Sequence, residues 1–125
     1  MASTTGIKPW LFKSSVALAL ISSAGHIKMG FSDGLYKSWD TLPAVARQSG
    51  YAGWDYMNVT FYLAAFLNWR WAKTGGPTTL EEKGMLAALV LGGLREGWGY
   101  FKIGTYRPLV VFWGAPLASL VAWLL

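Results

Sequence analysis

Apolar residues dominate four stretches of the chain, at residues 10–29, 54–71, 80–102 and 107–125. Each is close to the roughly 20 helical residues that cross ~30 Å of hydrocarbon. The pattern predicts an all-α, polytopic integral membrane protein with a single domain, in which four transmembrane helices form a bundle.

Local signals mark where these helices begin and bend. Thr79 followed three residues later by Glu82 is the pattern of a capping box, which predicts a helix start there. Pro108 occupies a tolerated first-turn position, whereas Pro116 should kink the last helix. The short connection at residues 103–107 predicts that the third and fourth helices are antiparallel neighbours.

The longest connection, residues 30–53, mixes aromatic and charged residues. Its pattern predicts a short amphipathic helix on the membrane surface, at about residues 41–49, ended by Gly50. The next stretch is bracketed by Trp54, Trp69 and Trp71, which we interpret as interfacial anchors.

A competing interpretation makes the first stretch a cleaved signal peptide. Lys8 and Lys13 would form its basic region, residues 16–21 its apolar core, and residues 22–24 a small-residue cleavage site. The apolar stretch is longer than the core of most signal peptides, which favours the transmembrane interpretation.

Composition supports a membrane location and excludes several kinds of site. Apolar residues make up 54% of the 125 residues and charged residues 14%, and the chain has eight Trp and fifteen Gly. Trp collects at membrane interfaces and Gly at close helix contacts in lipid. The absence of cysteine and the presence of a single histidine exclude thiolate zinc sites and multi-histidine metal sites, so we expect neither a metal nor a cofactor.

The net charge of +5 does not indicate a nucleic-acid partner. Under the predicted topology, the basic residues divide evenly between the two sides of the membrane and form no single basic patch. The same even division leaves the orientation in the membrane undetermined.

Glu96 is the most informative polar residue, because charge inside hydrocarbon is costly. It lies about 21 Å beyond Glu82 along a continuous helix. Small residues recur every four positions, at Gly84, Ala88 and Gly92, and the next positions with this spacing are Glu96 and Tyr100. Gly93 and Gly97 form a second pair of small residues with the same spacing. Such seams let another helix approach closely, so Glu96 is expected in the bundle interior.

A structural role for Glu96 is the alternative. Arg95 and Glu96 would then form an ion pair, or would cap a helix that ends early at Gly97 and leaves both side chains among headgroups.

The second helix carries three polar residues on one face, namely Asp55, Asn58 and Tyr62. Asp55 lies near the helix start, where it would cap the helix or favour its positive end. Asn58 and Tyr62 lie deeper, where they would form interhelical hydrogen bonds or line a binding site.

His26 shares a face of the first helix with Ser15 and Ser22. Its ordinary pKa is near neutrality, so it could transfer a proton, although a lone histidine near a helix end is more often structural. The predicted topology brings two groups to one side of the bundle. The first group is His26, Asp33 and Asp55, and the second is Glu96, Tyr100 and Arg107.

This convergence predicts a polar cluster that binds an apolar or lipid-like small molecule, with metal-free acid/base catalysis such as isomerisation, cyclisation or epoxide opening. The candidate catalytic residues are Glu96, His26, Asp55 and Tyr100, and the candidate ligand-binding residues are Asn58, Tyr62, Arg95 and Arg107. The alternative function is a non-catalytic accessory subunit of a larger membrane complex. A small transporter is a third class. The expected partners are the lipid bilayer and either the small molecule or other membrane subunits, and the chain could also form a homo-oligomer.

Overall fold

Helices account for nearly all regular structure in the computed structural model, which describes residues 6–32 and 34–125. The elements are α1 (Ile7–Phe31), α2 (Leu35–Ser38), α3 (Ala44–Thr74), α4 (Leu80–Lys102), the π-helical segment η1 (Val110–Gly114) and α5 (Ala115–Leu124). The described residues contain no strand, which agrees with the all-α prediction. Asp33, which the sequence placed near His26, lies outside the described residues.

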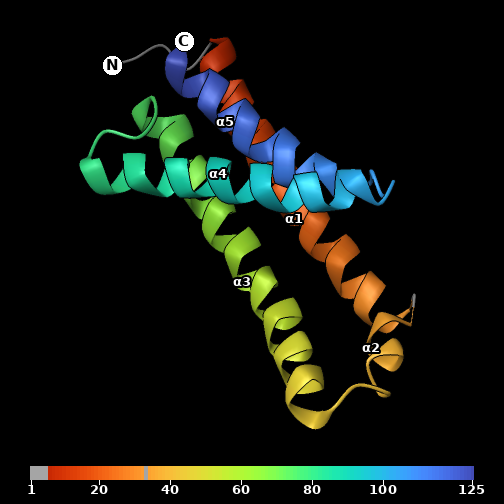
Figure 1. Ribbon diagram of the computed structural model, residues 1–125. Coiled ribbons are helices and arrows are strands. Elements are labelled where there is room, and N and C mark those ends of the chain that lie inside the picture. The colour runs from red at the N-terminus through yellow and green to blue at the C-terminus, as the bar shows by residue number, and fades with distance from the viewer. Residues whose placement is uncertain (1–5, 33) are drawn as a thin grey trace.

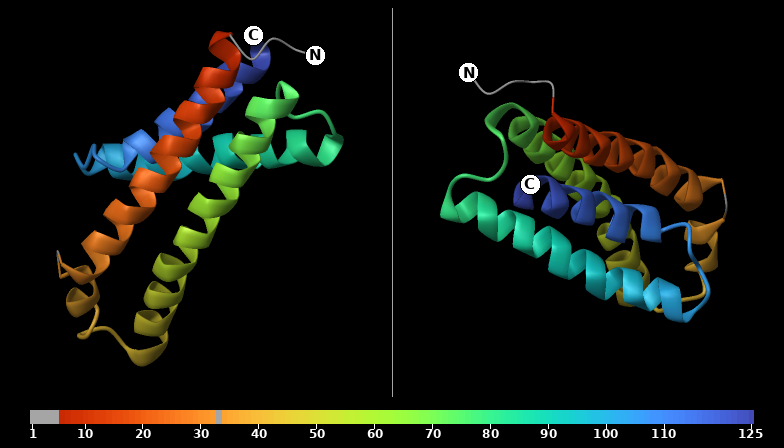
Figure 2. Two further views of the ribbon diagram at one scale, coloured as in Figure 1. Left: turned by 180° about the vertical axis from the view of Figure 1, so that it is seen from behind. Right: turned by 90° about the horizontal axis from the view of Figure 1, so that it is seen from above.

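The two long helices α1 and α3 run antiparallel, and α2 lies in the connection between them (Figure 1). Helix α4 runs at an angle to this pair and packs against η1 and α5, and α5 returns along the first half of α1 (Figure 2). The chain therefore reverses between α4 and α5, as expected from the short connection. The expectation that the third helix runs parallel to the first is wrong, because α4 lies at an angle to α1 (Figure 1).

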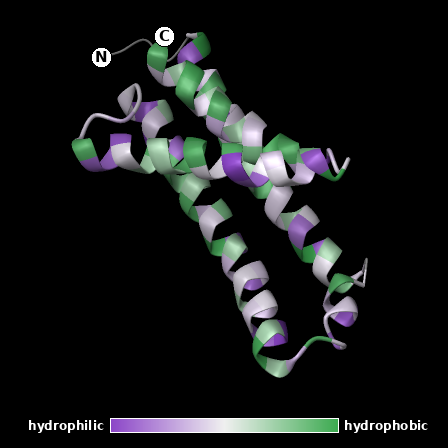
Figure 3. Ribbon diagram, viewed as in Figure 1, coloured by the Kyte–Doolittle hydropathy of each residue, from purple (hydrophilic) through white to green (hydrophobic). Residues whose placement is uncertain are grey.

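The prediction of four transmembrane helices, and with it the multi-pass membrane location, is overturned. Among residues 6–32 and 34–125, no helix combines the length and the apolar character that crossing a membrane requires. Hydrophilic and hydrophobic residues are interleaved along α1, α3 and α4 (Figure 3). The sequence interpretation counted Trp, Gly and Ser as compatible with a span, although these residues add little hydropathy, and the strongly apolar α5 has only ten residues.

Residues 44–74 form one continuous helix of 31 residues. The predicted surface helix at residues 41–49 and the separate helix at 54–71 are therefore wrong. Gly50 does not end a helix. Its missing side chain leaves room for the indole of Trp39, which would lie 3.2 Å from a Cβ at this position.

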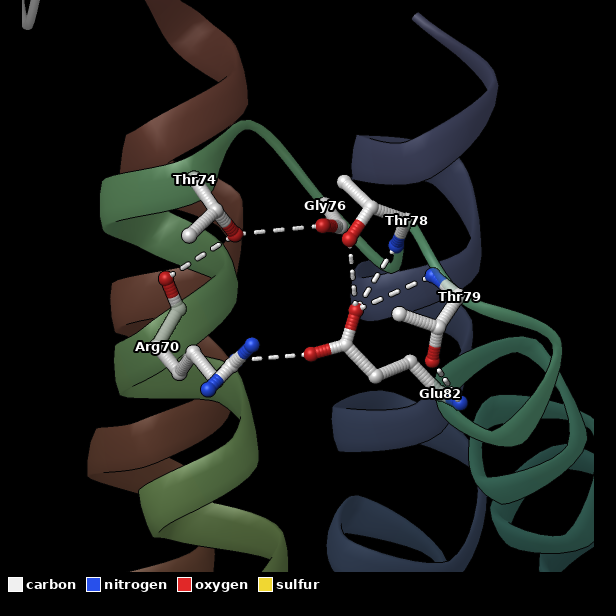
Figure 4. A network of polar contacts seen from close by, with 6 residues as sticks. All are labelled: Arg70, Thr74, Gly76, Thr78, Thr79 and Glu82. Atoms are coloured by element: carbon white, nitrogen blue, oxygen red, sulfur yellow. Dashed lines mark hydrogen bonds and ion pairs between the residues drawn. The ribbon is translucent and has the colours of Figure 1, made fainter.

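The start of α4 confirms the predicted capping box. The Thr79 hydroxyl accepts a hydrogen bond from the Glu82 backbone N–H at 3.2 Å, and the Glu82 carboxylate accepts from the Thr79 backbone N–H at 3.4 Å. That carboxylate also accepts from the Thr78 backbone N–H and pairs with Arg70 Nε on α3, both at 2.7 Å (Figure 4). The hydrogen bond from the Thr78 backbone is the main reason that the pKa of Glu82 falls from 4.5 to about 2. The network joins the end of α3 to the start of α4.

The hydrophobic core lies at the same end of the molecule, where α1 begins, α3 ends and α5 ends. Its buried members come from four different helices: Phe12, Trp71, Ala72, Leu86 and Ala122. Trp71 is therefore a core residue and not an interfacial anchor, whereas Trp69 is 48% exposed.

Helix α4 packs through a different glycine pair from the one expected to carry the main seam. A Cβ added at Gly93 would overlap the carbonyl oxygen of Phe112, and one at Gly97 would overlap the indole of Trp113. A Cβ at Gly84 or Gly92 would meet nothing within 4 Å. The close approach to η1 therefore uses Gly93 and Gly97.

Pro116 disturbs the last helix as predicted, but the disturbance takes the form of a π-helical segment. Proline has no N–H to bond the carbonyl four residues earlier, which is that of Phe112. The helix adopts the wider π-helical turn in η1, just before Pro116, and continues as α5. The Phe112 carbonyl faces α4 at Gly93, where only a residue without a side chain leaves room for it.

Candidate functional site

A cavity of about 350 Å³ that opens to solvent lies between α3 and α4, and parts of α1 and α5 form its inner wall. We call it the α3–α4 cavity. Small residues flank it on both helices: Gly53, Thr60 and Ala64 on α3, and Ala88, Gly92 and Gly93 on α4. Larger side chains would reduce this space at each of these positions except Gly93, which faces the Phe112 carbonyl. Ala88 and Gly92 of the predicted seam thus border a cavity, and not a neighbouring helix as the sequence predicted.

The inner wall of this cavity contains three buried polar side chains, Ser15, Asn68 and Ser119, each at most 3% exposed. Ser119 Oγ donates to Asn68 Oδ1 at 2.7 Å and lies 3.0 Å from Ser15 Oγ. Ser15 Oγ donates to the Ala115 carbonyl at 2.8 Å, and Asn68 Nδ2 donates to the Ala64 carbonyl at 2.9 Å. The three side chains satisfy one another's hydrogen-bonding groups and join α1, α3 and α5. Because these polar groups are already paired, the wall that faces the cavity is largely apolar.

A second cavity of about 320 Å³ adjoins the first, between the end of α1, the first half of α3 and the connection from α4 to η1. We call it the basic cavity, because its charged lining residues are Lys28 and Arg107. The two cavities share four lining residues: Met57, Phe61, Val111 and Phe112. Three of the predicted site residues line it together, namely His26, Tyr100 and Arg107.

His26 is held firmly at the edge of the basic cavity. It is 8% exposed, and its ring stacks on Trp54 with 3.7 Å between centroids. Its Nε2 lies 2.7 Å from the Trp54 carbonyl oxygen, which can only accept a hydrogen bond, so the proton resides on Nε2. Burial lowers the pKa of His26, which favours the neutral ring with Nδ1 as a free acceptor.

Tyr100 and Arg107 reach the same cavity from the end of α4 and the following loop. The Tyr100 ring stacks on Phe112 with 5.5 Å between centroids, which fixes its position. Arg107 is exposed, so its guanidinium can adjust to a ligand.

Asp55 is exposed on α3 and lines neither cavity. It does not cap a helix, because α3 begins eleven residues before it. Instead its carboxylate accepts a hydrogen bond from the Tyr36 hydroxyl. Burial and this hydrogen bond raise the pKa of Tyr36 to about 12. Asp55 therefore links α2 to α3.

The expectation that Glu96 is buried in the bundle is wrong. Its side chain is 57% exposed and lies 3.8 Å from Arg95, which is 87% exposed. The register explains this, since successive helical residues are rotated by ~100°. With Gly93 and Gly97 facing η1, Glu96 is placed at the rim of the α3–α4 cavity. The pairing with Arg95 agrees with the ion-pair alternative, whereas the alternative of a helix that ends at Gly97 is wrong, because α4 continues to Lys102.

The remaining candidates on α3 differ in their surroundings. Asn58 Oδ1 accepts a hydrogen bond from Ser23 Oγ on α1 at 2.9 Å, which is the interhelical bond that the sequence allowed for. Tyr62 is 42% exposed and lines neither cavity.

The described residues bring no three His, Asp or Glu side chains close enough to share a metal ion. The groups that surround the two cavities instead offer hydrogen bonds, positive charge and a neutral imidazole. Comparison with known proteins adds no family, since no protein-family model, curated protein or solved structure matches the chain.

Proposed function

We propose that this chain binds an apolar small molecule in the α3–α4 cavity. The observation that carries the proposal is a cavity of about 350 Å³ whose wall is largely apolar. Ligand sites in proteins typically measure ~300–1,000 Å³ and are lined mainly by apolar side chains with a few polar groups.

The arrangement of small residues supports this proposal. The apolar lining of this solvent-open cavity faces water when no ligand is bound, and covering apolar surface is favourable. Ala64 on α3 and Ala88 on α4 line it from its two flanking helices, and larger aliphatic residues at both positions would close the space. A bound apolar molecule would remove this lining from water.

Two neighbouring alanines on α4 provide a matched test. Ala88 lines the cavity and Ala87 does not, and both are exposed positions within the helix. Ala88→Trp should weaken the binding of dodecanol at least about tenfold, which corresponds to ~1.4 kcal/mol of lost burial. Ala87→Trp should leave the dissociation constant nearly unchanged. Isothermal titration calorimetry below the aggregation limit of dodecanol measures both.

Thermal unfolding by circular dichroism serves as the control that both variants are folded. Equal dodecanol affinity in the two variants would contradict the proposal, as would absence of binding to the unmodified chain. A chain that binds no dodecanol and purifies with a stoichiometric protein partner would instead favour the non-catalytic subunit.

Acid/base turnover of the bound molecule is a second candidate function, and the geometry of His26 is the observation that favours it. The Nε2 proton is committed to the Trp54 carbonyl, so Nδ1 of the neutral ring is available to accept a proton. Tyr100 lines the same cavity and has a hydroxyl that could donate one. Chemical conversion of a bound compound would support this second function, whereas binding without conversion would support only the first.

A further inference from the structure

We propose that the ligand of the α3–α4 cavity is an amphipathic anion whose carboxylate or phosphate head binds in the basic cavity. This inference rests on the proposed function and adds the chemical class of the ligand. The apolar chain would occupy the first cavity and the charged head the second.

The two cavities are placed so that one ligand can use both. They share Met57 and Phe61 on α3, and Val111 and Phe112 on η1. All four are apolar, so a hydrocarbon chain can lie against them without uncovering a polar group. The Met57 side chain is unbranched and flexible, which lets it move aside for a chain that passes between the cavities.

The lining of the basic cavity favours a negative charge. Lys28 comes from α1 and Arg107 from the loop before η1, and no Asp or Glu among the described residues lines this cavity. Neither cation belongs to an ion pair of the described residues. The guanidinium fork of arginine fits both carboxylate and phosphate oxygens.

Hydroxyl groups in the same lining complete a binding site for an oxyanion. Tyr100 and Thr105 line the basic cavity and can each donate one hydrogen bond. The site therefore combines two cations with two neutral donors, which come from three separate parts of the chain.

Among the described residues, neither Asp55 nor Glu96 lines the basic cavity, so its lining keeps a net positive charge. Asp55 lines neither cavity and accepts a hydrogen bond from Tyr36. Glu96 lines only the α3–α4 cavity, and its carboxylate lies 3.8 Å from the Arg95 guanidinium.

Ligands with the same chain and different head groups test the inference. Dissociation constants of dodecanol, dodecanoate and monododecyl phosphate are measured by calorimetry on the full chain. At least one of the two anions should bind about tenfold more tightly than dodecanol, and its advantage should shrink at high salt. The anion with the greater advantage identifies the head group.

A double variant removes the proposed head-group cations. Lys28→Met/Arg107→Met should abolish the advantage of the anions and leave dodecanol binding within about twofold of the unmodified chain. Lys83→Met/Lys102→Met is the matched control. It removes the same net charge from residues that line neither cavity and should retain the advantage.

The outcomes separate the two proposals. If dodecanol binds and neither anion binds more tightly, the inference is overturned while the proposed function stands. If the control loses the advantage as fully as the double variant, the effect is one of overall charge and the inference is also overturned. If dodecanol does not bind, the proposed function itself is wrong, whether or not the anions bind.

Discussion

Gly93→Ala is expected to lower the free energy of unfolding by about 3 kcal/mol, the upper part of the usual range for overpacking a tight contact. The added Cβ would overlap the carbonyl oxygen of Phe112, which belongs to the backbone and cannot rotate away. Helix α4 would have to move from η1, and the contact at Gly97 would open with it. Urea denaturation monitored by circular dichroism measures the change.

Gly84→Ala is the matched control on the same helix. A Cβ there meets nothing within 4 Å, so the variant should gain ~0.5–1 kcal/mol from the better helix propensity of alanine. The two substitutions should therefore change stability in opposite directions. Equal effects would show that α4 does not approach η1 through Gly93.

Trp71→Ala is expected to cost ~3–5 kcal/mol, because it empties the largest buried position of the core. Trp71 is 0% exposed and packs against Phe12 with 6.1 Å between ring centroids. The substitution would leave a cavity in the core that Trp71 shares with Phe12, Leu86 and Ala122. The free energy of unfolding in guanidinium chloride measures the loss.

Trp69→Ala provides the comparison two residues away. Trp69 is 48% exposed, and its ring lies beneath the Lys73 ammonium at 5.2 Å. Its removal should change the free energy of unfolding by no more than ~0.5–1 kcal/mol, as expected for a surface residue with one cation–π contact. A loss similar to that of Trp71→Ala would contradict the assignment of Trp71 alone to the core.

Local patterns predicted local structure well. The capping box of Thr79 and Glu82 was recognisable, because its two residues interact within one helical turn. The disturbance at Pro116 followed from the missing N–H of proline. Long-range packing was not predictable in this way. The ring that occupies the space beside Gly50 comes from Trp39, and no local rule places it there.

The membrane interpretation was wrong because it treated composition as evidence of location. Many of the aromatic residues pack against one another within the fold. Trp39 contacts Tyr36, Tyr51 and Trp54 around the α1–α2–α3 connection. Trp and Gly are frequent in membrane proteins, but the same residues can also build close contacts between helices.

The candidate site was predictable only in part. His26, Tyr100 and Arg107 do line one cavity, although the topology used to bring them together was wrong. Asn68 and Ser119 were missed. Ser119 is the one hydroxyl-bearing residue in the apolar run 108–125, which was an available signal, whereas Asn68 is one of several polar residues in its stretch. The sequence could not show whether Gly84 and Gly92 or Gly93 and Gly97 make the close contact of α4. The atom that leaves no room for a side chain at Gly93 is a backbone carbonyl on η1, which is distant in the sequence.

The location of a bound ligand tests the central claim most directly. Crystals soaked with dodecanol that carries bromine on its terminal carbon would reveal the chain end by anomalous scattering. The account predicts a bromine peak inside the α3–α4 cavity, between Ala64 and Ala88. A peak only on the outer surfaces of the helices, or an empty cavity at saturating ligand, would contradict it.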